Sequence, residues 1–286
     1  MAMTQLSNKR VIICSIVRNA EDGLRKNIPV IDKLCSYFKD YDIVVYENDS
    51  KDKTKEILKN WQKQAPDKIH ISINDTDSGN TIPQASEVQS NPFFSQRRIG
   101  KMVNLRNKYM DYIEEHKLTA DYMMVVDLDV AQLYLDGIIS SFKSNIEWDA
   151  VTAFGYSTSP KLRRRYHDTY ALTMWRDENN PQTEEKIKKN ADKLGKLKPA
   201  DNWVRVFSAF GGLAIYRFEA VKDIKYQLLK NDDKRVEVKC EHFSITKQMA
   251  EKGYNRFYIN PCMQLKYQKL TLSIIFKRIK NLLHIR

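Results

Sequence analysis

The first half of the chain alternates short apolar runs with longer amphipathic stretches. The runs have the length of strands, and their expected ranges are 10–17, 41–47, 68–74 and 122–129. Between the last two, the basic stretch 97–116 carries apolar residues at helical spacing, at positions 99, 102, 103, 105, 109, 110 and 113. Strands that alternate with helices predict an α/β fold with a mainly parallel, doubly wound central sheet flanked by helices.

The second half of the chain has a different character. A further strand is expected at 149–156. Residues 157–203 are polar, charged and poor in apolar periodicity, which predicts a mobile loop or a weak helix. We expect a single domain over residues 1–268, followed by a tail at 269–286.

Polar side chains follow three of the predicted strands where each one ends. Arg18 follows the first strand, Asp49 the second, and Asp127 and Asp129 end the fourth. Because ligands of parallel sheets bind beyond the carboxyl ends of the strands, we expect these side chains to line one crevice. Two carboxylates one residue apart suit a hard divalent cation, Mg²⁺ or Mn²⁺, carrying a diphosphate. The alternative is that this pair caps a helix or forms a salt bridge.

The composition is that of an ordinary globular chain, with 42% hydrophobic and 29% charged residues. The sequence shows no apolar run of bilayer-spanning length and no apolar signal-peptide core, and its four cysteines have neither metal-site nor disulfide spacing. We therefore expect a cytoplasmic protein. The net charge of +12 is uneven, because residues 252–286 hold eight Lys or Arg and no acidic residue. Such a segment predicts an anionic partner surface.

The tail at 269–286 predicts a basic amphipathic helix. Its apolar residues fall on one helical face, at positions 272, 275, 276, 279, 282 and 283. This helix is too short and too charged to span a bilayer, but it suits the surface of an anionic membrane, and we expect no nucleic-acid partner. Docking of this kind would place the protein on the cytosolic membrane face. The alternative is a helix packed on the protein's own core with a solvated basic face.

Several segments, taken in order, resemble one family of enzymes. They are VRNAED, ENDSKDKT, DLD, FSAFGGLAIYR and CEHFSITKQMAEKGY, at 17–22, 47–54, 127–129, 207–217 and 240–254. They are similar to glycosyltransferases of the GT-A fold, which take a sugar from a nucleotide-diphosphate donor. YHDTYAL (166–172), FGG and CEH more narrowly resemble the fungal capsule-associated mannosyltransferase group. The resemblance implies a Rossmann-like domain with a nucleotide-binding half at 10–130 and an acceptor half at 131–268.

The resemblance also implies roles at the donor. Asp49 would hydrogen-bond the nucleobase, and Arg18 would face the donor beside it. Asp129 would ligate the metal between the two phosphates. Asp127 would lie near the ribose or the metal's water shell, as a second metal-binding residue.

Two further features of the donor site follow from the resemblance. A positive side chain of the basic helix, Arg98 or Arg106, would face the diphosphate. Gly211 and Gly212 would let the backbone approach the donor sugar or the acceptor, since no Cβ intrudes.

On the acceptor side, the resemblance places a catalytic carboxylate at the start of a helix. Glu241 would deprotonate the acceptor hydroxyl as general base, and His242 is the other candidate because it stands where the family usually has Asp. The alternative for Glu241 is that it only complements the helix dipole. Asp168 would contact the acceptor, or else form a loop turn.

We expect a metal-dependent glycosyltransferase that moves a sugar to a hydroxyl of a glycan or a lipid-linked acceptor. One alternative is a nucleotidyltransferase, but such enzymes typically carry a glycine-rich phosphate loop near the first strand, and SIVRNAED has none. The other alternative is a non-catalytic protein that binds membranes or nucleic acid through its basic tail. That interpretation leaves the aspartates and glycines unexplained.

Overall fold

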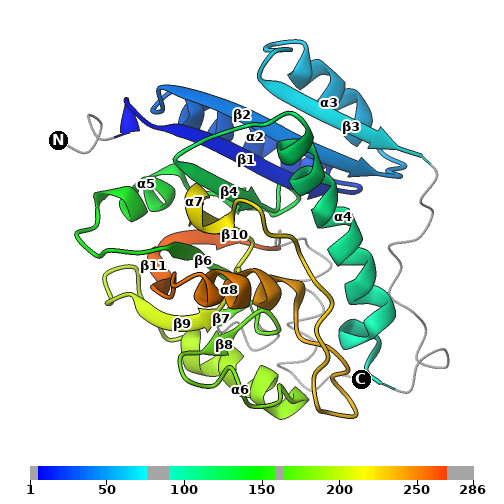
Figure 1. Cartoon of the computed structure of the whole chain (residues 1–286). Helices are drawn as coiled ribbons and strands as arrows, with labels where there is room; N and C mark the ends of the chain where they lie inside the picture. Colours follow the sequence, from blue (N-terminus) through cyan, green and yellow to red (C-terminus); the bar gives the residue numbers. More distant parts are fainter. Residues whose placement is uncertain (1–5, 76–89, 159–163, 269–286) are drawn as a thin grey trace, which may run out of the picture.

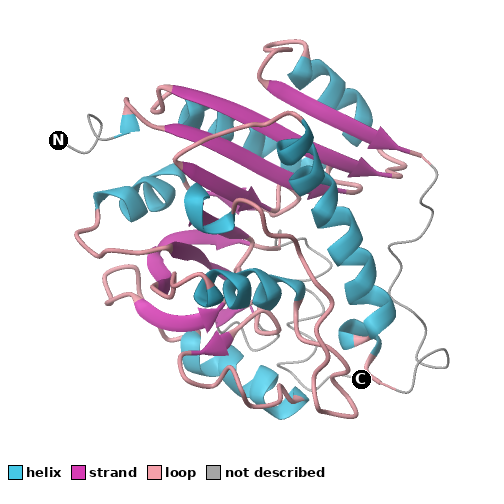
Figure 2. Ribbon diagram, viewed as in Figure 1, coloured by secondary structure: helices cyan, strands magenta, loops and turns pink. Residues whose placement is uncertain are grey.

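The computed structural model describes residues 6–75, 90–158 and 164–268, which form one central sheet with helices on both faces (Figures 1 and 2). In the first half, the elements are β1 (Arg10–Val17), α2 (Glu21–Cys35), β2 (Asp40–Asn48), α3 (Thr54–Gln62), β3 (Ile69–Asn74), η1 (Pro92–Phe94), α4 (Gln96–Glu115) and β4 (Tyr122–Val126). In the second half they are β5 (Gln132–Leu133), α5 (Leu135–Lys143), β6 (Ala150–Thr158), β7 (Arg164–Tyr166), β8 (Thr173–Met174), α6 (Glu184–Leu194), β9 (Val204–Ser208), β10 (Leu213–Arg217), α7 (Phe218–Val221), α8 (Glu241–Glu251) and β11 (Phe257–Lys266).

The predicted α/β fold is confirmed, and all four strands of the first half lie close to their expected positions. They run parallel in the order β3-β2-β1-β4. Alternate residues of β1 face opposite layers, as strand geometry requires. Ile12 packs in the core shared with α4 and α8, whereas Ile13 packs in the core shared with α2, α3 and α5. Burial on both faces explains why the strand sequences are almost wholly apolar.

The second half continues the same sheet in mixed directions. β10 lies between β4 and β6 and is antiparallel to both, while β6 and β11 are parallel. The segment 207–217 holds the end of β9 and the whole of β10. The chain turns between them at Gly211 and Gly212, whose φ angles are +65° and +87°. Few residues other than glycine adopt this conformation, so the glycine pair sets the point where the chain reverses.

The segment predicted as a mobile loop or a weak helix, 157–203, contains regular structure in its described part. β7 extends the edge of β6, and α6 is an 11-residue helix. The side chain of Thr183 caps α6 by accepting a hydrogen bond from the N–H of Lys186. Helix is therefore the better description of its centre, while its mobility stays a prediction.

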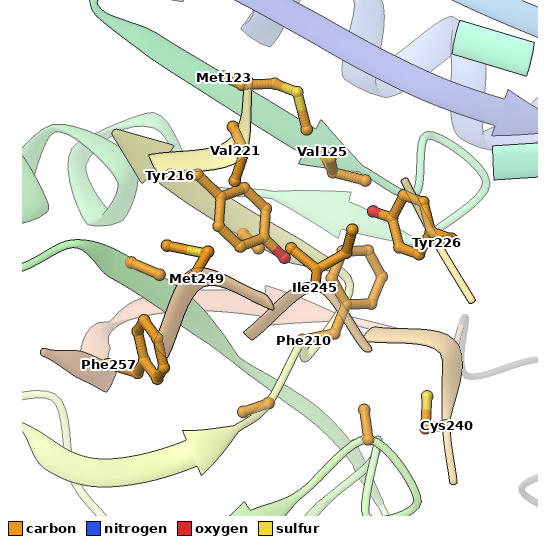
Figure 3. Packing of buried hydrophobic residues seen from close by; sticks show 14 of the residues in the cluster. Met123, Val125, Phe210, Tyr216, Val221, Tyr226, Cys240, Ile245, Met249 and Phe257 are labelled. Atoms are coloured by element: carbon orange, nitrogen blue, oxygen red, sulfur yellow. The ribbon is translucent and has the colours of Figure 1, made fainter. Parts of the chain in front are cut away.

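Helix α8 is anchored through its apolar face, as Figure 3 shows. Ile245 and Met249 are fully buried and pack in one cluster with Tyr216 of β10 and Phe257 of β11. This packing fixes the first turn of α8 next to the carboxyl end of β4. The amphipathic helix predicted for 269–286 lies outside the described residues. Within the described ranges, none of the helices has the length and apolar character needed to cross a membrane.

Candidate active site

The ends of β1, β2 and β4 meet at one pocket of about 160 Å³, as the strand-end pattern predicts. Arg18 lines it from the end of β1, Asn48 from the end of β2, and Asp127 and Asp129 from the end of β4. Arg106 enters the pocket from α4. The crevice of the parallel half of the sheet thus holds two carboxylates and two guanidinium groups.

Asn27 of α2 fixes the loop that carries the two aspartates. Its side-chain amide donates hydrogen bonds to the carbonyl oxygens of Leu128 (3.1 Å) and Val130 (2.8 Å). Its side-chain oxygen accepts one from the N–H of Leu133 (3.0 Å). Because Asn27 is fully buried, these bonds are shielded from water and hold the loop in one conformation.

The two aspartates lie at the open side of the crevice. The side chain of Asp127 is 22% exposed, and Asp129 is exposed. Enclosure by the protein, and then the nearby carboxylates of Asp129, Asp168 and Glu241, raise the pKa of Asp127 to about 8, although the charge of Arg106 opposes them. Four acidic side chains, Asp127, Asp129, Asp168 and Glu241, thus lie near the guanidinium of Arg106.

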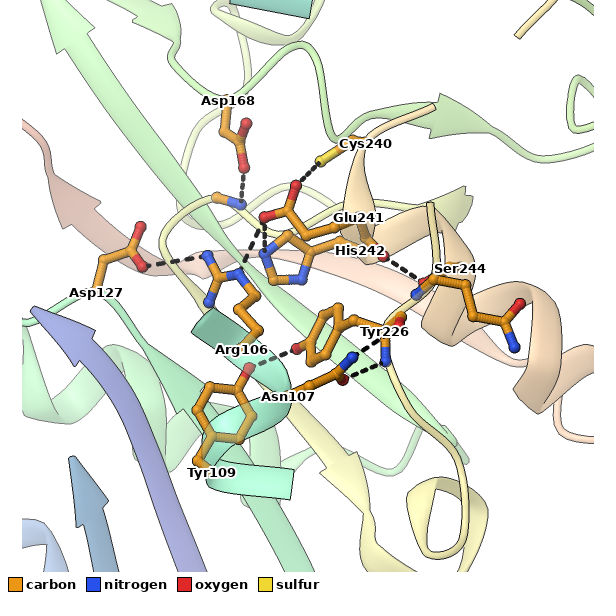
Figure 4. Close-up of polar contacts among 12 residues, drawn as sticks. Arg106, Asn107, Tyr109, Asp127, Asp168, Tyr226, Cys240, Glu241, His242 and Ser244 are labelled. Carbon is orange, nitrogen blue, oxygen red and sulfur yellow. Dashed lines mark hydrogen bonds and ion pairs between the residues drawn. The ribbon is translucent and has the colours of Figure 1, made fainter. Parts of the chain in front are cut away.

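Arg106 is the buried cation of the site (Figure 4). Its Nε donates a hydrogen bond to Oε1 of Glu241 at 3.0 Å, and its Nη2 lies 3.7 Å from Oδ1 of Asp127. The guanidinium stacks over the rings of Phe210 (4.9 Å) and Tyr226 (5.9 Å). Its Nη1 is buried without a hydrogen-bond partner among the described residues. These contacts fix the plane of the guanidinium and leave one donor unused.

Glu241 begins α8, but it does not serve as a simple helix cap. The N-cap position is Cys240, which makes no side-chain cap hydrogen bond. Oε1 of Glu241 accepts from Arg106, and Oε2 accepts from Sγ of Cys240 at 3.3 Å. Burial alone would raise the pKa of Glu241. The effects of His242 and Arg106 outweigh that of burial and lower the pKa to about 2. The carboxylate is therefore ionised at neutral pH and fully engaged.

His242 is a buried, neutral ring. It stacks on Phe210 with ring centroids 3.8 Å apart, and its Nε2 lies 3.6 Å from Oε1 of Glu241. Burial and the charge of Arg106 lower the pKa of His242 to about 3, so it carries no charge at neutral pH. Because His242 is uncharged, the positive charge of Arg106 is the one that keeps Glu241 ionised.

Asp168 and Gly211 lie next to this group. Oδ2 of Asp168 accepts a hydrogen bond from the N–H of Gly211 at 3.1 Å. Burial, and then the charge of Glu241, raise the pKa of Asp168 to about 6. A Cβ on Gly211 would lie only 2.1 Å from the carbonyl oxygen of Ala153, and one on Gly212 would lie 2.9 Å from the hydroxyl of Tyr267. Close packing within the chain therefore already requires Gly211, and the φ of +87° at Gly212 favours glycine there, whatever the donor or acceptor requires.

The remaining predicted donor residues differ in their placement. Asp49 is buried, with φ +53°, and forms ion pairs with Lys51 (2.5 Å) and Arg18 (4.0 Å). Arg98 donates from Nη1 to the carbonyl oxygen of Phe93 and stands eight residues before Arg106 in the same helix, or about 12 Å along its axis. Of the two arginines, the structure brings Arg106 to the aspartates and leaves Arg98 at the start of α4.

A comparison with protein families shows to which family the chain belongs. Residues 10–247 match the model of the family described as cryptococcal mannosyltransferase 1. The chain belongs to this family. The family is named for sugar transfer, and an α/β domain with a crevice at the end of β4 is compatible with that chemistry. Among curated proteins, none matches the chain significantly in sequence.

Several solved structures are similar to this chain at low identity. The mannosyltransferase PcManGT from Pyrobaculum calidifontis, in complex with GDP-Man and Mn²⁺, is 14% identical, with 97% of this chain and 62% of that chain covered and a TM-score of 0.48. S. aureus TarS 1–349 is 14% identical, with 95% and 64% covered and a TM-score of 0.45. Glucosyl-3-phosphoglycerate synthase from Mycobacterium tuberculosis, with Mn²⁺, UDP-Glc and phosphoglyceric acid, is 9% identical, with 98% and 80% covered and a TM-score of 0.47. The chain thus spans less than two thirds of the length of the first two.

Sequence reasoning gave no role to four residues of the candidate site. Asn48 is buried in the pocket, and neither atom of its side-chain amide has a hydrogen-bond partner among the described residues. Its position at a strand end was a usable signal. Asn27 could have been noticed as a polar residue on the apolar face of its helix. Phe210 and Tyr226 brace Arg106 from more than 100 residues away, and nothing local in the sequence indicates that contact.

Proposed function

We propose that this protein is a glycosyltransferase that uses a divalent cation to move a sugar, with mannose the first candidate, from a nucleotide-diphosphate donor to a hydroxyl of a glycan or lipid-linked acceptor. Membership of a mannosyltransferase family supports the sugar. The observation that carries the proposal is the pocket at the ends of β1, β2 and β4, which combines Asp127 and Asp129 with Arg106. A diphosphate and a cation together would balance those charges.

The donor set of the crevice fits Mn²⁺ or Mg²⁺. Within the described ranges, no three His, Cys, Asp or Glu side chains gather into a complete metal cage. Asp127 and Asp129 alone suit an ion that takes one or two carboxylates from the protein and its other ligands from phosphates and water. Enclosure and the neighbouring carboxylates raise the pKa of Asp127, and a bound cation would favour its ionised form. When bound, the ion would neutralise charge on the leaving diphosphate.

The chain's own residues supply the rest of donor recognition in this proposal. The free Nη1 of Arg106 is a preorganised donor for a phosphate oxygen, since its neighbours already fix the guanidinium. Asn48 offers one donor and one acceptor inside the pocket, which suits a nucleobase edge or a ribose hydroxyl. Asp49 and Arg18 stand at the adjoining strand ends as further donor contacts. Gly211 and Gly212 keep their proposed role of close approach to the sugar.

The acceptor hydroxyl would attack the anomeric carbon from the side of Asp168 and Glu241. Both carboxylates lie near the Arg106 guanidinium, next to the chain reversal before β10 (Figure 4). His242 is a poor candidate for the base at neutral pH, because it is buried and packed flat on Phe210. Residues 157–203, which supply Asp168, are proposed to adjust over the bound donor.

For cellular placement, we propose a cytoplasmic protein with peripheral attachment to an anionic membrane face. The support is the sequence of the tail, with basic residues beside an apolar helical stripe. Such attachment would bring the protein to the membrane that holds a lipid-linked acceptor.

A panel of sugar nucleotides tests the proposal. Each donor is incubated with the protein and Mn²⁺, and free nucleoside diphosphate is measured with and without a chelator. We expect metal-dependent release from at least one donor, GDP-mannose first. Release of pyrophosphate from nucleoside triphosphates would indicate a nucleotidyltransferase instead. Release of neither product would favour a non-catalytic binding protein and contradict the proposal.

A further inference from the structure

We propose that Glu241 is a positioning residue that holds Arg106, and that Asp168 is the catalytic base that takes the proton of the acceptor hydroxyl. This assignment rests on the glycosyl transfer proposed above, and it departs from the expectation that the carboxylate at the start of α8 is the base. Its two halves rest on different contacts.

The contacts of Glu241 leave it no free oxygen for an acceptor. Oε1 accepts from Nε of Arg106 at 3.0 Å and lies 3.6 Å from Nε2 of His242, while Oε2 accepts from Sγ of Cys240 at 3.3 Å. The side chain is 6% exposed. A base must come within hydrogen-bond reach of the proton it removes, and its conjugate acid must be accessible near the working pH. Glu241 meets neither condition, because protonation would break a buried ion pair.

The same contacts suit Glu241 to orienting Arg106. The Nε bond and the stacking on Phe210 and Tyr226 fix the guanidinium plane from three sides. In that orientation Nη2 faces Asp127, and Nη1 remains a buried donor without a partner in the described part of the chain. Arg106 would then present its unused donor to the diphosphate, and Glu241 would act through it.

Asp168 has the free capacity that Glu241 lacks. It is partly exposed, and its hydrogen bonds come from the backbone N–H groups of Gly211, which donates to Oδ2 at 3.1 Å, and of Ala171, so they orient the carboxyl without neutralising it. Unlike Glu241 and Asp127, it has no ion pair among the described residues. Burial and the charge of Glu241 raise the pKa of Asp168 to about 6, which suits proton transfer near neutral pH.

The groups that face Asp168 come from all the elements around it. They are Glu241 and Cys240 at the start of α8, Arg106 of α4, Tyr166 of β7, Tyr267 after β11 and Asp127 after β4. In the transfer step, a lone pair of the acceptor oxygen forms a bond to the anomeric carbon. The bond from that carbon to the diphosphate breaks, and its electron pair leaves with the diphosphate. The hydroxyl proton passes to Asp168, so charge and atoms balance.

Thermal unfolding tests the positioning role of Glu241 without an activity assay. Glu241→Gln should lower Tm by several degrees, because it removes the counterion of a buried guanidinium. Combined with Arg106→Met, it should lower Tm little further than Arg106→Met alone, because the two side chains act as one pair. Glu251→Gln at the exposed end of α8 is the matched control and should leave Tm unchanged. Additive effects of the two site variants would overturn the positioning role.

Kinetics with GDP-mannose, Mn²⁺ and the best acceptor sugar test the two halves together. Asp168→Asn should lower kcat by about 10²- to 10⁴-fold while donor Kd stays within about twofold, and added formate should partly restore Asp168→Ala. Glu241→Gln should instead weaken donor binding, with a smaller effect on kcat. Asp192→Asn, an exposed residue of α6, is the control.

The opposite pattern would overturn the assignment. This means normal donor binding and Tm with a 10²-fold lower kcat for Glu241→Gln, or wild-type kcat for Asp168→Asn. If the wild-type protein turns over no sugar nucleotide, the proposed function fails and the base assignment of Asp168 fails with it. The thermal cycle still decides the role of Glu241 in that case.

Discussion

Replacing Gly211 by alanine should destabilise the fold strongly. Gly211 has φ +65°, a conformation that costs an alanine about 1–2 kcal/mol. The added Cβ would also lie only 2.1 Å from the carbonyl oxygen of Ala153. That oxygen belongs to the backbone of a central strand and cannot easily move. Overpacking of this kind costs about 1–3 kcal/mol, so the free energy of unfolding should fall by about 2–5 kcal/mol in total.

Urea unfolding of three alanine variants separates the two contributions. Gly253→Ala is the control for conformation, because Gly253 has φ +91° and its Cβ would meet nothing within 4 Å, so it should cost only about 1–2 kcal/mol. Gly100→Ala lies in α4, where the Cβ would only contact the Leu228 side chain at 3.6 Å, and should gain about 0.5–1 kcal/mol.

The order of the three variants in unfolding free energy shows whether Gly211 serves packing or the approach of a substrate. If Gly211→Ala is no less stable than Gly253→Ala but loses donor turnover, the glycine serves the approach of a substrate rather than the packing against Ala153. That result would refute the packing explanation. Loss of stability well beyond that of Gly253→Ala supports it.

Three other predictions concern separate parts of the chain. Asp149 is buried, and its Oδ1 accepts a hydrogen bond from Nη2 of Arg256 at 2.8 Å. Burial alone would raise the pKa of Asp149, but the contacts with Arg256 outweigh burial and lower the pKa below the ordinary 3.8. Asp149→Asn should therefore cost about 1–3 kcal/mol at pH 7 in urea unfolding, and the difference from wild type should vanish as the pH falls below 3.8 through the lowered folded-state pKa. Asn48→Ala should raise the donor KM roughly tenfold with little change in Tm, and an unchanged KM would remove Asn48 from the donor site. A chain ending at Gln268 should stay folded but no longer co-sediment with phosphatidylserine vesicles at low salt, whereas equal sedimentation of both chains would exclude docking through the tail.

The parallel half of the fold could be predicted from the sequence because its signals are local. Strands buried on both faces must be apolar, and the helices between them keep one apolar face, so β1 and β4 were visible as runs. The antiparallel place of β10 between β4 and β6 was not predicted. Its place depends on a reversal at Gly211 and Gly212 and on pairing with strands far away in the chain, and neither leaves a periodic pattern.

The candidate site was predictable to the same extent. Asp127 and Asp129 follow a strand directly, so their convergence with the other strand ends follows from the topology of parallel sheets. The partnership of Arg106 with Glu241 joins residues 135 positions apart, and no local pattern encodes it. For that reason the sequence alone favoured Glu241 as a base, whereas its observed contacts favour a positioning role.

Release of nucleoside diphosphate from GDP-mannose, measured for wild type and Asp129→Asn with and without Mn²⁺, tests the central claim most directly. The account predicts release by the wild-type protein that depends on Mn²⁺, and a fall of at least about 10²-fold in Asp129→Asn at unchanged Tm, because the variant removes a carboxylate ligand that lies exposed at the crevice. Asp201→Asn, an exposed carboxylate outside the crevice, should retain full release. Equal Mn²⁺-dependent release by wild type and Asp129→Asn would contradict the assignment of the crevice at the end of β4 as the metal and donor site.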